Sequence, residues 1–355
     1  MKIEAKKSET ILLVGSASIY LSSGKASVFE SNLQEKKLIV VKKEKQIAIK
    51  LDEDSSFFLK LGPSSSYRII QGDPFPILWK KVINEIIEQG RKKILILGGI
   101  DTGKSTFCVL LANSILKFGI QSAIIDADIG QSDLGPPTTL GLGLIRNYIE
   151  DLSHTEIISL IFVGQITPSH DFEKVILGIK RLLERANIFN SSLFTIINTD
   201  GWIKDIEAKI YKKKLIEEIS PELIVCIGKK NDFVGLYNKN KNFVQLDSSR
   251  YVKKRSKGER KKLREYGYRK YLNNATLKQF NLNRIGLKKQ VEIFVDRNKI
   301  VGLVDREDFL VGIGILKEFN KEKGVIKIFT PVERIDELQK IDIGFIKISE
   351  YGEEL

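Results

Sequence analysis

The chain has 355 residues, 42% of them apolar and 29% charged, and its net charge is +13. The length favours two or three domains, and this apolar fraction excludes a chain that is disordered throughout. The sequence shows no apolar run of membrane-spanning length, no leader-like segment after Met1, and only two cysteines, Cys108 and Cys226, each in an apolar stretch without ligand partners nearby; we therefore expect no membrane association and a reducing intracellular setting, cytoplasmic or nuclear.

Residues 1–73 are expected to form an N-terminal β domain. Short apolar or alternating runs at 11–14, 38–41, 46–51 and 56–61 are separated by glycines, as is typical of strands joined by tight turns. A linker follows at 72–76. The next residues, 77–88, carry apolar side chains at helical spacing and predict a helix.

Residues 74–280 are expected to form an α/β domain with a mostly parallel sheet. Expected strands and helices alternate there, which is typical of helices packed on both faces of a parallel sheet. In such sheets, ligands bind where the strands end. The expected strands are 94–97, 122–126, 160–164, 193–198 and 223–228, and the expected helices are 104–117, 172–187 and 205–218.

Positive charge is concentrated near the end of this domain. Residues 251–271 carry ten Lys or Arg and two Glu, eight of the thirteen net positive charges. We expect 253–271 to be a surface helix that binds a polyanion, with a merely solvated helix as the alternative. Beyond it, 281–355 should be a C-terminal β domain, with strands at 291–295, 300–304, 309–316 and 324–329.

The strand expected at 94–97 leads into a phosphate-binding sequence. Gly98 is followed by Gly103, Lys104 and Ser105 at the G-x4-G-K-[ST] spacing, and a helical pattern begins directly afterwards. Lys104 would reach the outer phosphates and Ser105 would ligate Mg²⁺. The alternative is an ordinary glycine-rich turn. The residues expected to contact the nucleotide are Gly98, Gly99, Ile100, Asp101, Thr102, Gly103, Lys104, Ser105 and Thr106.

Two carboxylates, Asp126 and Asp128, close the next strand. They share a face if the strand stays extended, so one would hold Mg²⁺ through water and the other would accept a proton from an attacking hydroxyl. Gln131 would orient the nucleophile, or it is a polar residue of the loop. A GTPase is disfavoured because no Asn-Lys-x-Asp sequence follows a strand.

Five sequence motifs together resemble one family. They are residues 98–106, 126–131, 163–170 and 198–202, and the basic run with its arginines. In order and spacing this chain is similar to the polynucleotide 5′-hydroxyl kinases, which include the RNA kinase subunit of the pre-mRNA cleavage machinery, its ribosomal-RNA-processing relatives and archaeal counterparts. That family has a P-loop kinase domain flanked by two β-rich domains.

The resemblance implies ATP and Mg²⁺ as cofactors and the 5′-hydroxyl end of RNA, with DNA as a second option, as substrate. It also implies RNA-processing proteins as partners. Lys104 and Asp128 would be catalytic, Asp128 as the base that activates the hydroxyl. Thr167 would hold the RNA backbone and Trp202 would stack on a terminal base. Three arginines would close over the phosphates, Arg255 on the nucleotide and Arg260 and Arg264 in catalysis.

Two rival functions remain open at this point. One is a catalytically weak family member that acts as an ATP-bound scaffold for RNA processing. The other is an ATP-driven nucleic-acid remodeller without kinase activity. Transfer of the γ-phosphate to RNA rather than to water would distinguish the three.

Overall fold

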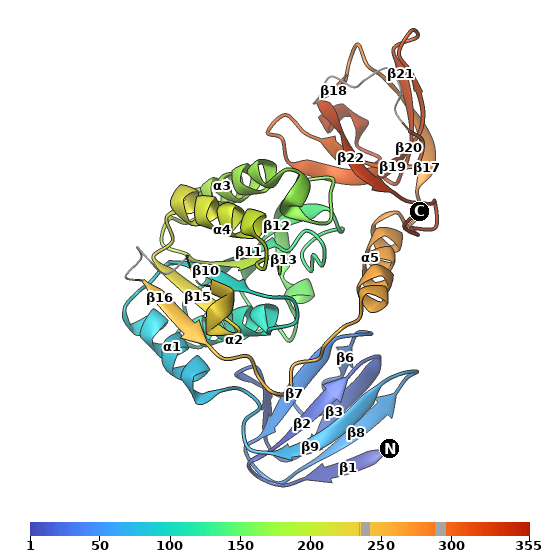
Figure 1. The fold of residues 1–355 in the computed structure, drawn as a ribbon. Helices are drawn as coiled ribbons and strands as arrows, with labels where there is room; N and C mark the ends of the chain where they lie inside the picture. The colour runs from blue at the N-terminus through green and yellow to red at the C-terminus, as the bar shows by residue number, and fades with distance from the viewer. Residues whose placement is uncertain (234, 236–241, 288–295) are drawn as a thin grey trace.

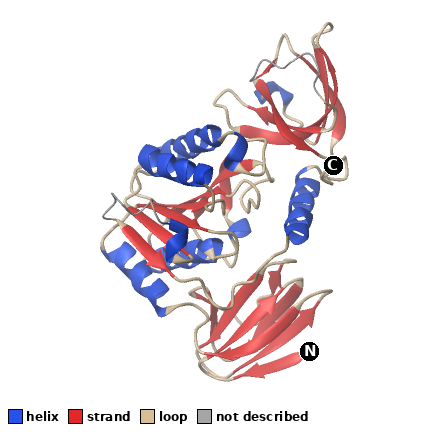
Figure 2. Cartoon of the chain, viewed as in Figure 1, coloured by secondary structure: helices blue, strands red, loops and turns tan. Residues whose placement is uncertain are grey.

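The three-dimensional structure is a computed structural model that describes residues 1–233, 235, 242–287 and 296–355. Figure 1 shows a central α/β domain with one β domain at either end, and helix α5 (Lys257–Tyr271) standing between the two β domains. Figure 2 shows that helices are concentrated in the central part of the chain. In the part of the chain that the structure describes, no helix has the length and apolarity needed to cross a membrane.

The N-terminal domain is all-β, as the sequence predicts, and it consists of two antiparallel sheets. The four strands expected there are present. The other strands of the domain were not predicted, because small and polar residues alternate in them with the apolar ones. β3 (Ala17–Ser23), for example, buries every second side chain, and the more exposed positions between them are serines and a tyrosine. The strand order of one sheet is β1 (Lys2–Ala5), β8 (Ser55–Leu61), β3, β6 (Ile39–Val41). The strand order of the other sheet is β5 (Ser31–Asn32), β4 (Ala26–Val28), β7 (Gln46–Leu51), β2 (Glu9–Val14), β9 (Ser66–Gln71).

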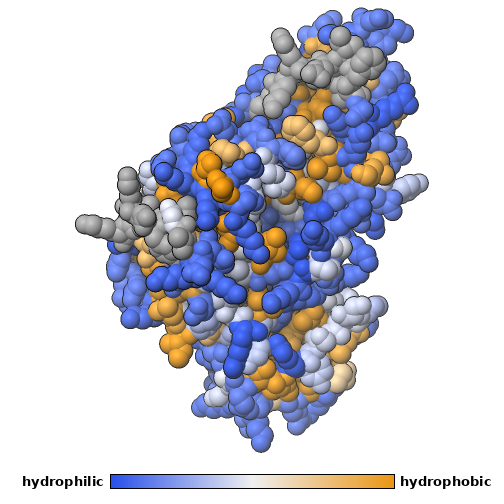
Figure 3. Space-filling model, viewed as in Figure 1, coloured by the Kyte–Doolittle hydropathy of each residue, from blue (hydrophilic) through white to orange (hydrophobic). Residues whose placement is uncertain are grey.

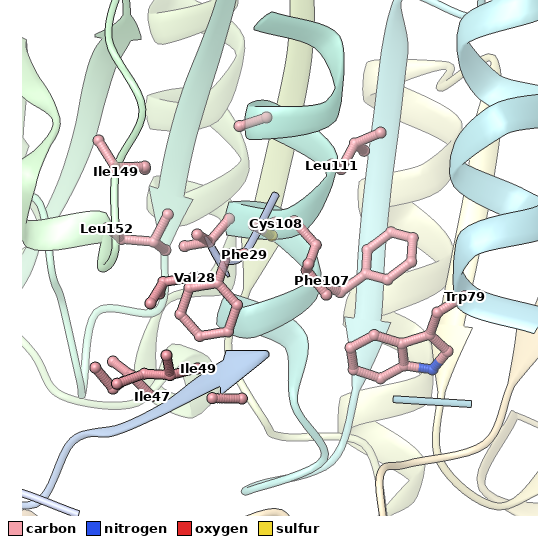
Figure 4. Packing of buried hydrophobic residues seen from close by; sticks show 14 of the residues in the cluster. Val28, Phe29, Ile47, Ile49, Trp79, Phe107, Cys108, Leu111, Ile149 and Leu152 are labelled. Carbon is pink, nitrogen blue, oxygen red and sulfur yellow. The ribbon is translucent and has the colours of Figure 1, made fainter. Parts of the chain in front are cut away.

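The core of this β domain continues into the central domain. Trp79 of α1 (Ile77–Glu88) stacks on Phe75 at 5.5 Å between ring centroids and meets Phe107 of α2 (Lys104–Lys117) edge-on at 5.3 Å. Figure 4 shows Phe29 from the N-terminal domain among these α2 side chains. Asn113 of α2 donates a 2.7 Å hydrogen bond to the carbonyl oxygen of Phe29. The N-terminal domain is therefore fixed against the helix that begins at Lys104.

Among the described residues, the central sheet has seven strands. Five of them pair in parallel, so the expected fold class is confirmed. The structure differs from the sequence-based expectation in the antiparallel strands at one edge of the sheet. β12 was not predicted, because glycines interrupt its apolar pattern. The strand expected at 160–164 runs from 156 to 162. The order is β13 (Glu156–Phe162), β12 (Thr139–Ile145), β11 (Ser122–Ala127), β14 (Phe194–Thr199), β10 (Lys93–Gly98), β15 (Leu223–Ile227), β16 (Phe243–Leu246).

Helices cover both faces of this sheet. Helices α1 and α2 pack on one face, and α3 (Phe172–Phe189) and α4 (Ile206–Ile219) pack on the other. Because β14 lies between β10 and β11, the carboxyl ends of these three strands are adjacent, and they carry the phosphate-binding sequence, the paired carboxylates and Asn198. The sheet topology thus brings together three of the sequence motifs.

Among the described residues, the C-terminal domain forms one six-stranded sheet. Its first strand begins at Thr276, so residues 276–280, which we assigned to the central α/β domain, pair within this sheet instead. The strand expected at 291–295 lies outside the described residues. The order is β17 (Thr276–Asn281), β21 (Val325–Thr330), β20 (Leu310–Asn320), β19 (Lys299–Val304), β22 (Lys340–Lys347), β18 (Gly286–Leu287).

Candidate active site

A large open cavity of about 1790 Å³ lies where the strand ends, the N-terminal domain and α5 face one another. The phosphate-binding sequence lines it from residue 99 onwards, together with Asp128, Gln131, Thr167, Trp202 and the three arginines. Asp126 is not among the lining residues. Most of the predicted site residues therefore share one cavity. Figure 3 shows that one face of the molecule is mostly hydrophilic, with smaller apolar patches.

The phosphate-binding sequence forms a loop that only small residues permit at two positions. A Cβ atom on Gly98 would lie 2.6 Å from the carbonyl oxygen of Ile227, and Gly103 has a φ of +100° where α2 begins. The Lys104 ammonium donates to the carbonyl oxygens of Gly98, at 3.0 Å, and Gly99, at 2.8 Å. Burial lowers the pKa of Lys104. These acceptors are neutral, so the positive charge remains for an anion bound at the start of the helix.

Asp126 and Asp128 have different surroundings, because Asp126 lies within β11 whereas Asp128 follows its last residue, Ala127. Asp126 is fully buried and accepts hydrogen bonds from the backbone N–H of Asp133, at 2.7 Å, and from Asn198 Nδ2, at 3.0 Å. Burial, with the charges of Asp133 and Asp128, raises the pKa of Asp126 to about 7. Asp126 therefore organises the loop, and Asp128 is the carboxylate that faces the cavity.

Asp128 carries the features of a general base. One carboxylate oxygen accepts the Gln131 backbone N–H at 3.1 Å. Burial raises the pKa of Asp128 to about 6, and the negative charge of Asp200 adds to this rise while Lys104 opposes it. A carboxylate with such a pKa is ionised at neutral pH and is more basic than an exposed one.

Asp200 is a site residue for which the sequence predicted no role. Its carboxylate accepts hydrogen bonds from Lys212 Nζ at 2.7 Å and the Tyr211 hydroxyl at 3.0 Å, and all three side chains are buried. The only signal was its place in the motif 198–202, directly after β14. The buried ion pair fixes the turn that carries Trp202 towards the cavity.

The residues expected to contact RNA lie on separate loops around the cavity. Trp202 is half-buried: its ring stacks on Tyr211 at 6.0 Å, and its Nε1 donates to Asp205 at 2.6 Å. The Thr167 hydroxyl lies 3.3 Å from the Ser169 hydroxyl. The Gln131 side chain donates to the carbonyl oxygens of Gly130 at 2.6 Å and of Arg260 at 3.3 Å, so it connects its loop to α5.

The three arginines, which the family resemblance implied would close over the phosphates, contact two different carboxylates. Helix α5 begins at Lys257, after a capping box of Ser256 and Glu259, so Arg255 precedes it. Arg255 and Arg260 both contact the Asp101 carboxylate of the phosphate-binding loop, at 3.4 and 3.1 Å. Arg264 instead pairs with Glu354.

Carboxylates of the chain itself also offset the positive charge around the cavity. Lys45, from the N-terminal domain, lies 2.5 Å from Asp133 and 2.9 Å from Asp151 of the central domain. Burial disfavours its charge, but these two carboxylates outweigh that effect and raise the pKa of Lys45. Lys253 pairs with Glu44 in the same way. Sequence reasoning missed these pairs because their partners lie far apart in the chain.

The strand ends offer oxygen ligands that fit Mg²⁺. Asn198 Nδ2 lies 3.4 Å from the Ser105 hydroxyl and bonds Asp126, and Asn198 Oδ1 is buried without a hydrogen-bond partner among the described residues. In residues 1–233, 235, 242–287 and 296–355, no three His, Cys, Asp or Glu side chains converge on a metal position. This donor set suits an ion that takes its other ligands from phosphates and water.

Comparison with known proteins gives one consistent picture. The P-loop family of the mRNA cleavage and polyadenylation factor CLP1 matches residues 98–274. The polyribonucleotide 5′-hydroxyl-kinase of Pyrococcus abyssi is 30% identical over 329 residues, with 76% of this chain and 92% of the relative covered. The corresponding protein of Methanocaldococcus jannaschii is 27% identical over 323 residues, 74% of this chain and 89% of the relative.

More distant relatives agree in fold. A CLP1 homologue of Drosophila grimshawi is 28% identical over 255 residues, which cover 67% of this chain and 57% of the relative. The solved structure of the wild-type Clp1p–Pcf11p complex aligns with a TM-score of 0.74 over 98% of this chain and 97% of that chain, at 12% identity. The central P-loop domain with two flanking β domains is therefore a shared fold.

Proposed function

The chain belongs to the family of CLP1 and the archaeal polyribonucleotide 5′-hydroxyl-kinases, and we propose that it transfers the γ-phosphate of ATP to the 5′-hydroxyl end of RNA. The observation that carries this proposal is the arrangement of Lys104 and Asp128 in one cavity. Lys104 begins α2 with its charge free for phosphate, and Asp128 faces the same space with a raised pKa.

Asp128 acts as the base that takes the proton of the 5′-hydroxyl. The hydroxyl oxygen forms its bond to the γ-phosphorus while the bond from this phosphorus to the β-phosphate oxygen breaks, and ADP leaves. Its neighbours hold it in place: the Gln131 backbone donates to one oxygen, and Asp200 is fixed by Lys212. The proton is transferred while negative charge shifts onto the phosphoryl oxygens, so the positive groups opposite Asp128 must be in place beforehand.

The positive groups come from two segments of the chain. Lys104 and the backbone N–H groups of 98–106 lie at the strand ends. Arg255 and Arg260 come from the basic segment and contact Asp101 of the same loop. Such an arrangement can stabilise charge that develops during transfer. The oxygen atoms of Ser105, Asn198 and Asp126 would hold Mg²⁺. The charge of the ion would lower the repulsion between the phosphates and an attacking oxygen.

The RNA end would lie along the face that Trp202 and Thr167 share. An indole ring at the edge of a cavity is a stacking platform that accepts any base, and alanine substitution at such platforms costs about 1–3 kcal/mol per base. The requirement for an RNA rather than a DNA end, the protein partners in RNA processing and an intracellular location remain parts of the proposal. The relatives' printed names support RNA as the acceptor.

The direct test uses ATP labelled at the γ-phosphate with two RNA oligonucleotides of the same sequence. One has a 5′-hydroxyl and the other a 5′-phosphate. Label should appear only on the 5′-hydroxyl RNA, and a matching DNA oligonucleotide reports the preference between the two. Binding of ATP without any transfer would favour a scaffold, and release of labelled inorganic phosphate alone would favour a remodeller.

Replacement of Trp202 separates the RNA side from the nucleotide side. Trp202→Ala should raise KM for the RNA while KM for ATP stays nearly unchanged, and Trp202→Phe should keep most of the affinity because a ring remains. Since Trp202 also packs on Tyr211, the melting temperature is measured in parallel. A large loss of thermal stability with unchanged KM for RNA would make Trp202 a packing residue.

A further inference from the structure

After β22, the last strand of the C-terminal sheet, a tight turn brings the chain back onto α5. Ser349 N–H donates to the Glu353 carbonyl oxygen at 2.8 Å, and Leu355 N–H donates to Lys347 at 3.0 Å. Gly352 has a φ of +77°, and a Cβ atom there would lie 2.8 Å from the backbone nitrogen of Arg269. We call residues 348–355 the α5 hook. Figure 1 shows its end beside the upper end of α5.

The hook contacts α5 through several charged hydrogen bonds. The Glu354 carboxylate accepts Arg264 Nε at 2.5 Å and Nη2 at 2.8 Å. Lys261 Nζ donates to the Glu354 carbonyl oxygen at 3.0 Å, and Arg269 Nε donates to the Tyr351 carbonyl oxygen at 3.1 Å. The contact is therefore specific and fixes both the helix and one guanidinium group.

The geometry of the Arg264–Glu354 pair leaves part of the guanidinium for another ligand. Glu354 uses Nε and one N–H of Nη2, so both N–H groups of Nη1 and the second of Nη2 are not used by it. The two side chains are only 14% and 13% exposed, and Arg264 lines the cavity with the phosphate-binding loop. A bidentate pair of this kind restricts the orientation of an arginine.

Arg264 differs from the other two arginines in where its partner lies. Arg255 and Arg260 are held by Asp101 of the central domain, whereas Glu354 belongs to the segment that follows the C-terminal sheet. The basic segment is thus anchored at its start on the phosphate-binding loop and further along on the hook. This second anchor connects the C-terminal domain to the cavity.

We propose that Glu354 is a positioning residue, which holds Arg264 in the orientation needed for phosphoryl transfer, so that the C-terminal domain takes part in catalysis through the α5 hook. This rests on the proposed function and on the role that the family resemblance implies for Arg264, which lines the cavity and would contact the phosphates. Glu354 itself touches no substrate; it acts by limiting the orientations of Arg264.

The test replaces Glu354 in the full chain and measures steady-state transfer to 5′-hydroxyl RNA. Glu354→Gln keeps the size of the side chain but offers one acceptor in place of two, so kcat should fall roughly 10- to 100-fold, the range that a misplaced catalytic group can produce. Glu354→Asp should lose less, because its carboxylate stays charged. KM for ATP should change little. The matched control is Glu353→Gln at the exposed neighbouring position, which should keep the wild-type kcat.

A double substitution shows whether Glu354 acts through Arg264. If it does, Arg264→Ala combined with Glu354→Gln should have the same kcat as Arg264→Ala alone. The positioning role is overturned if the double variant loses a further factor in kcat equal to the loss in Glu354→Gln alone. It is also overturned if Glu354→Gln has a wild-type or higher kcat while Arg264→Ala is impaired. Either result leaves the kinase function intact. A wild-type kcat in Arg264→Ala removes the premise as well. Melting temperatures of all variants identify any that lose the fold, and Glu354→Asp then carries the comparison.

Discussion

The phosphate-binding loop and the basic segment 253–271 both present positive groups to one cavity, but they are built differently. In the loop, one contiguous stretch supplies backbone, lysine and hydroxyl, and Lys104 is held by carbonyl oxygens only six and five residues away. In the basic segment, Arg255, Arg260 and Arg264 each depend on a carboxylate that is 90 or more residues away. Local geometry therefore fixes the loop, whereas tertiary contacts fix the arginines.

This difference predicts that substitutions in the loop have the largest effects. Lys104→Ala should reduce kcat by at least about 10²–10³-fold, the loss seen when one preorganised charge-stabilising donor is removed. The fold should persist, because the ammonium bonds only two carbonyl oxygens of its own loop. Transfer of labelled phosphate and a circular dichroism melting curve check both parts. Near-normal transfer by this variant would contradict the assignment of the phosphate site.

Asp128→Asn should lower kcat by about 10²–10⁴-fold, the usual contribution of a general base, with little change in ATP affinity. In the wild type, kcat/KM should fall as the pH drops through about 6, where Asp128 of the free enzyme becomes protonated. The pH profile of kcat/KM from 5 to 8 measures this. Weaker binding of Mg²⁺·ATP at unchanged kcat would instead make Asp128 a metal ligand.

The same pKa has a consequence for stability. The folded-state pKa of Asp128 is raised to about 6, so the unfolded chain loses this proton first as the pH rises from about 4. The fold therefore loses stability between about pH 4 and pH 6, and the loss is complete above about pH 6. Asp128→Asn should therefore leave the free energy of unfolding at neutral pH equal to or above that of the wild type. Urea titrations of the two proteins at matched pH provide the comparison.

On the basic segment, Arg260→Ala should have a smaller effect than Lys104→Ala because Arg255 shares its position on Asp101. Loss of one charged hydrogen-bond donor, worth about 1.5–3 kcal/mol, corresponds to a decrease in kcat of roughly 10- to 150-fold. Arg260→Lys keeps the charge without the planar fork and should recover only part of the rate. Equal kcat values for wild type and Arg260→Ala would mean that Arg260 only connects α5 to Asp101 of the phosphate-binding loop and does not act on the phosphates.

The smallest effect is expected at the exposed lysines of α5. Lys262 is exposed and lines the cavity, so Lys262→Ala should weaken RNA binding without changing kcat and reduce the slope of log affinity against log salt by about 1. Lys253 is a poorer choice, because it is paired with Glu44. Fluorescence anisotropy at several salt concentrations measures the slope. An unchanged slope would mean that the RNA does not pass this part of the helix.

The sequence alone was sufficient for the features that depend on neighbouring residues. The phosphate-binding loop, the helix that follows it, the alternation of strands and helices and the concentration of charge at 251–271 could be predicted, because glycine placement, side-chain periodicity and charge act over a few residues. The end of the strand indicated that Asp126 and Asp128 belong to the site, and only the family resemblance implied which of them is the base. The fold class followed from the order of the elements.

Only the tertiary structure decided which charged groups meet. The contacts of Asp101 with Arg255, of Glu354 with Arg264 and of Lys45 with Asp133 join residues 154, 90 and 88 positions apart. Nothing in the local pattern of a carboxylate shows which distant cation it will approach, since that depends on how the sheets pack and on the desolvation that makes pairing favourable. The same physics separated Asp126 from Asp128: two carboxylates one residue apart became a buried organiser of the loop and a group that faces the cavity.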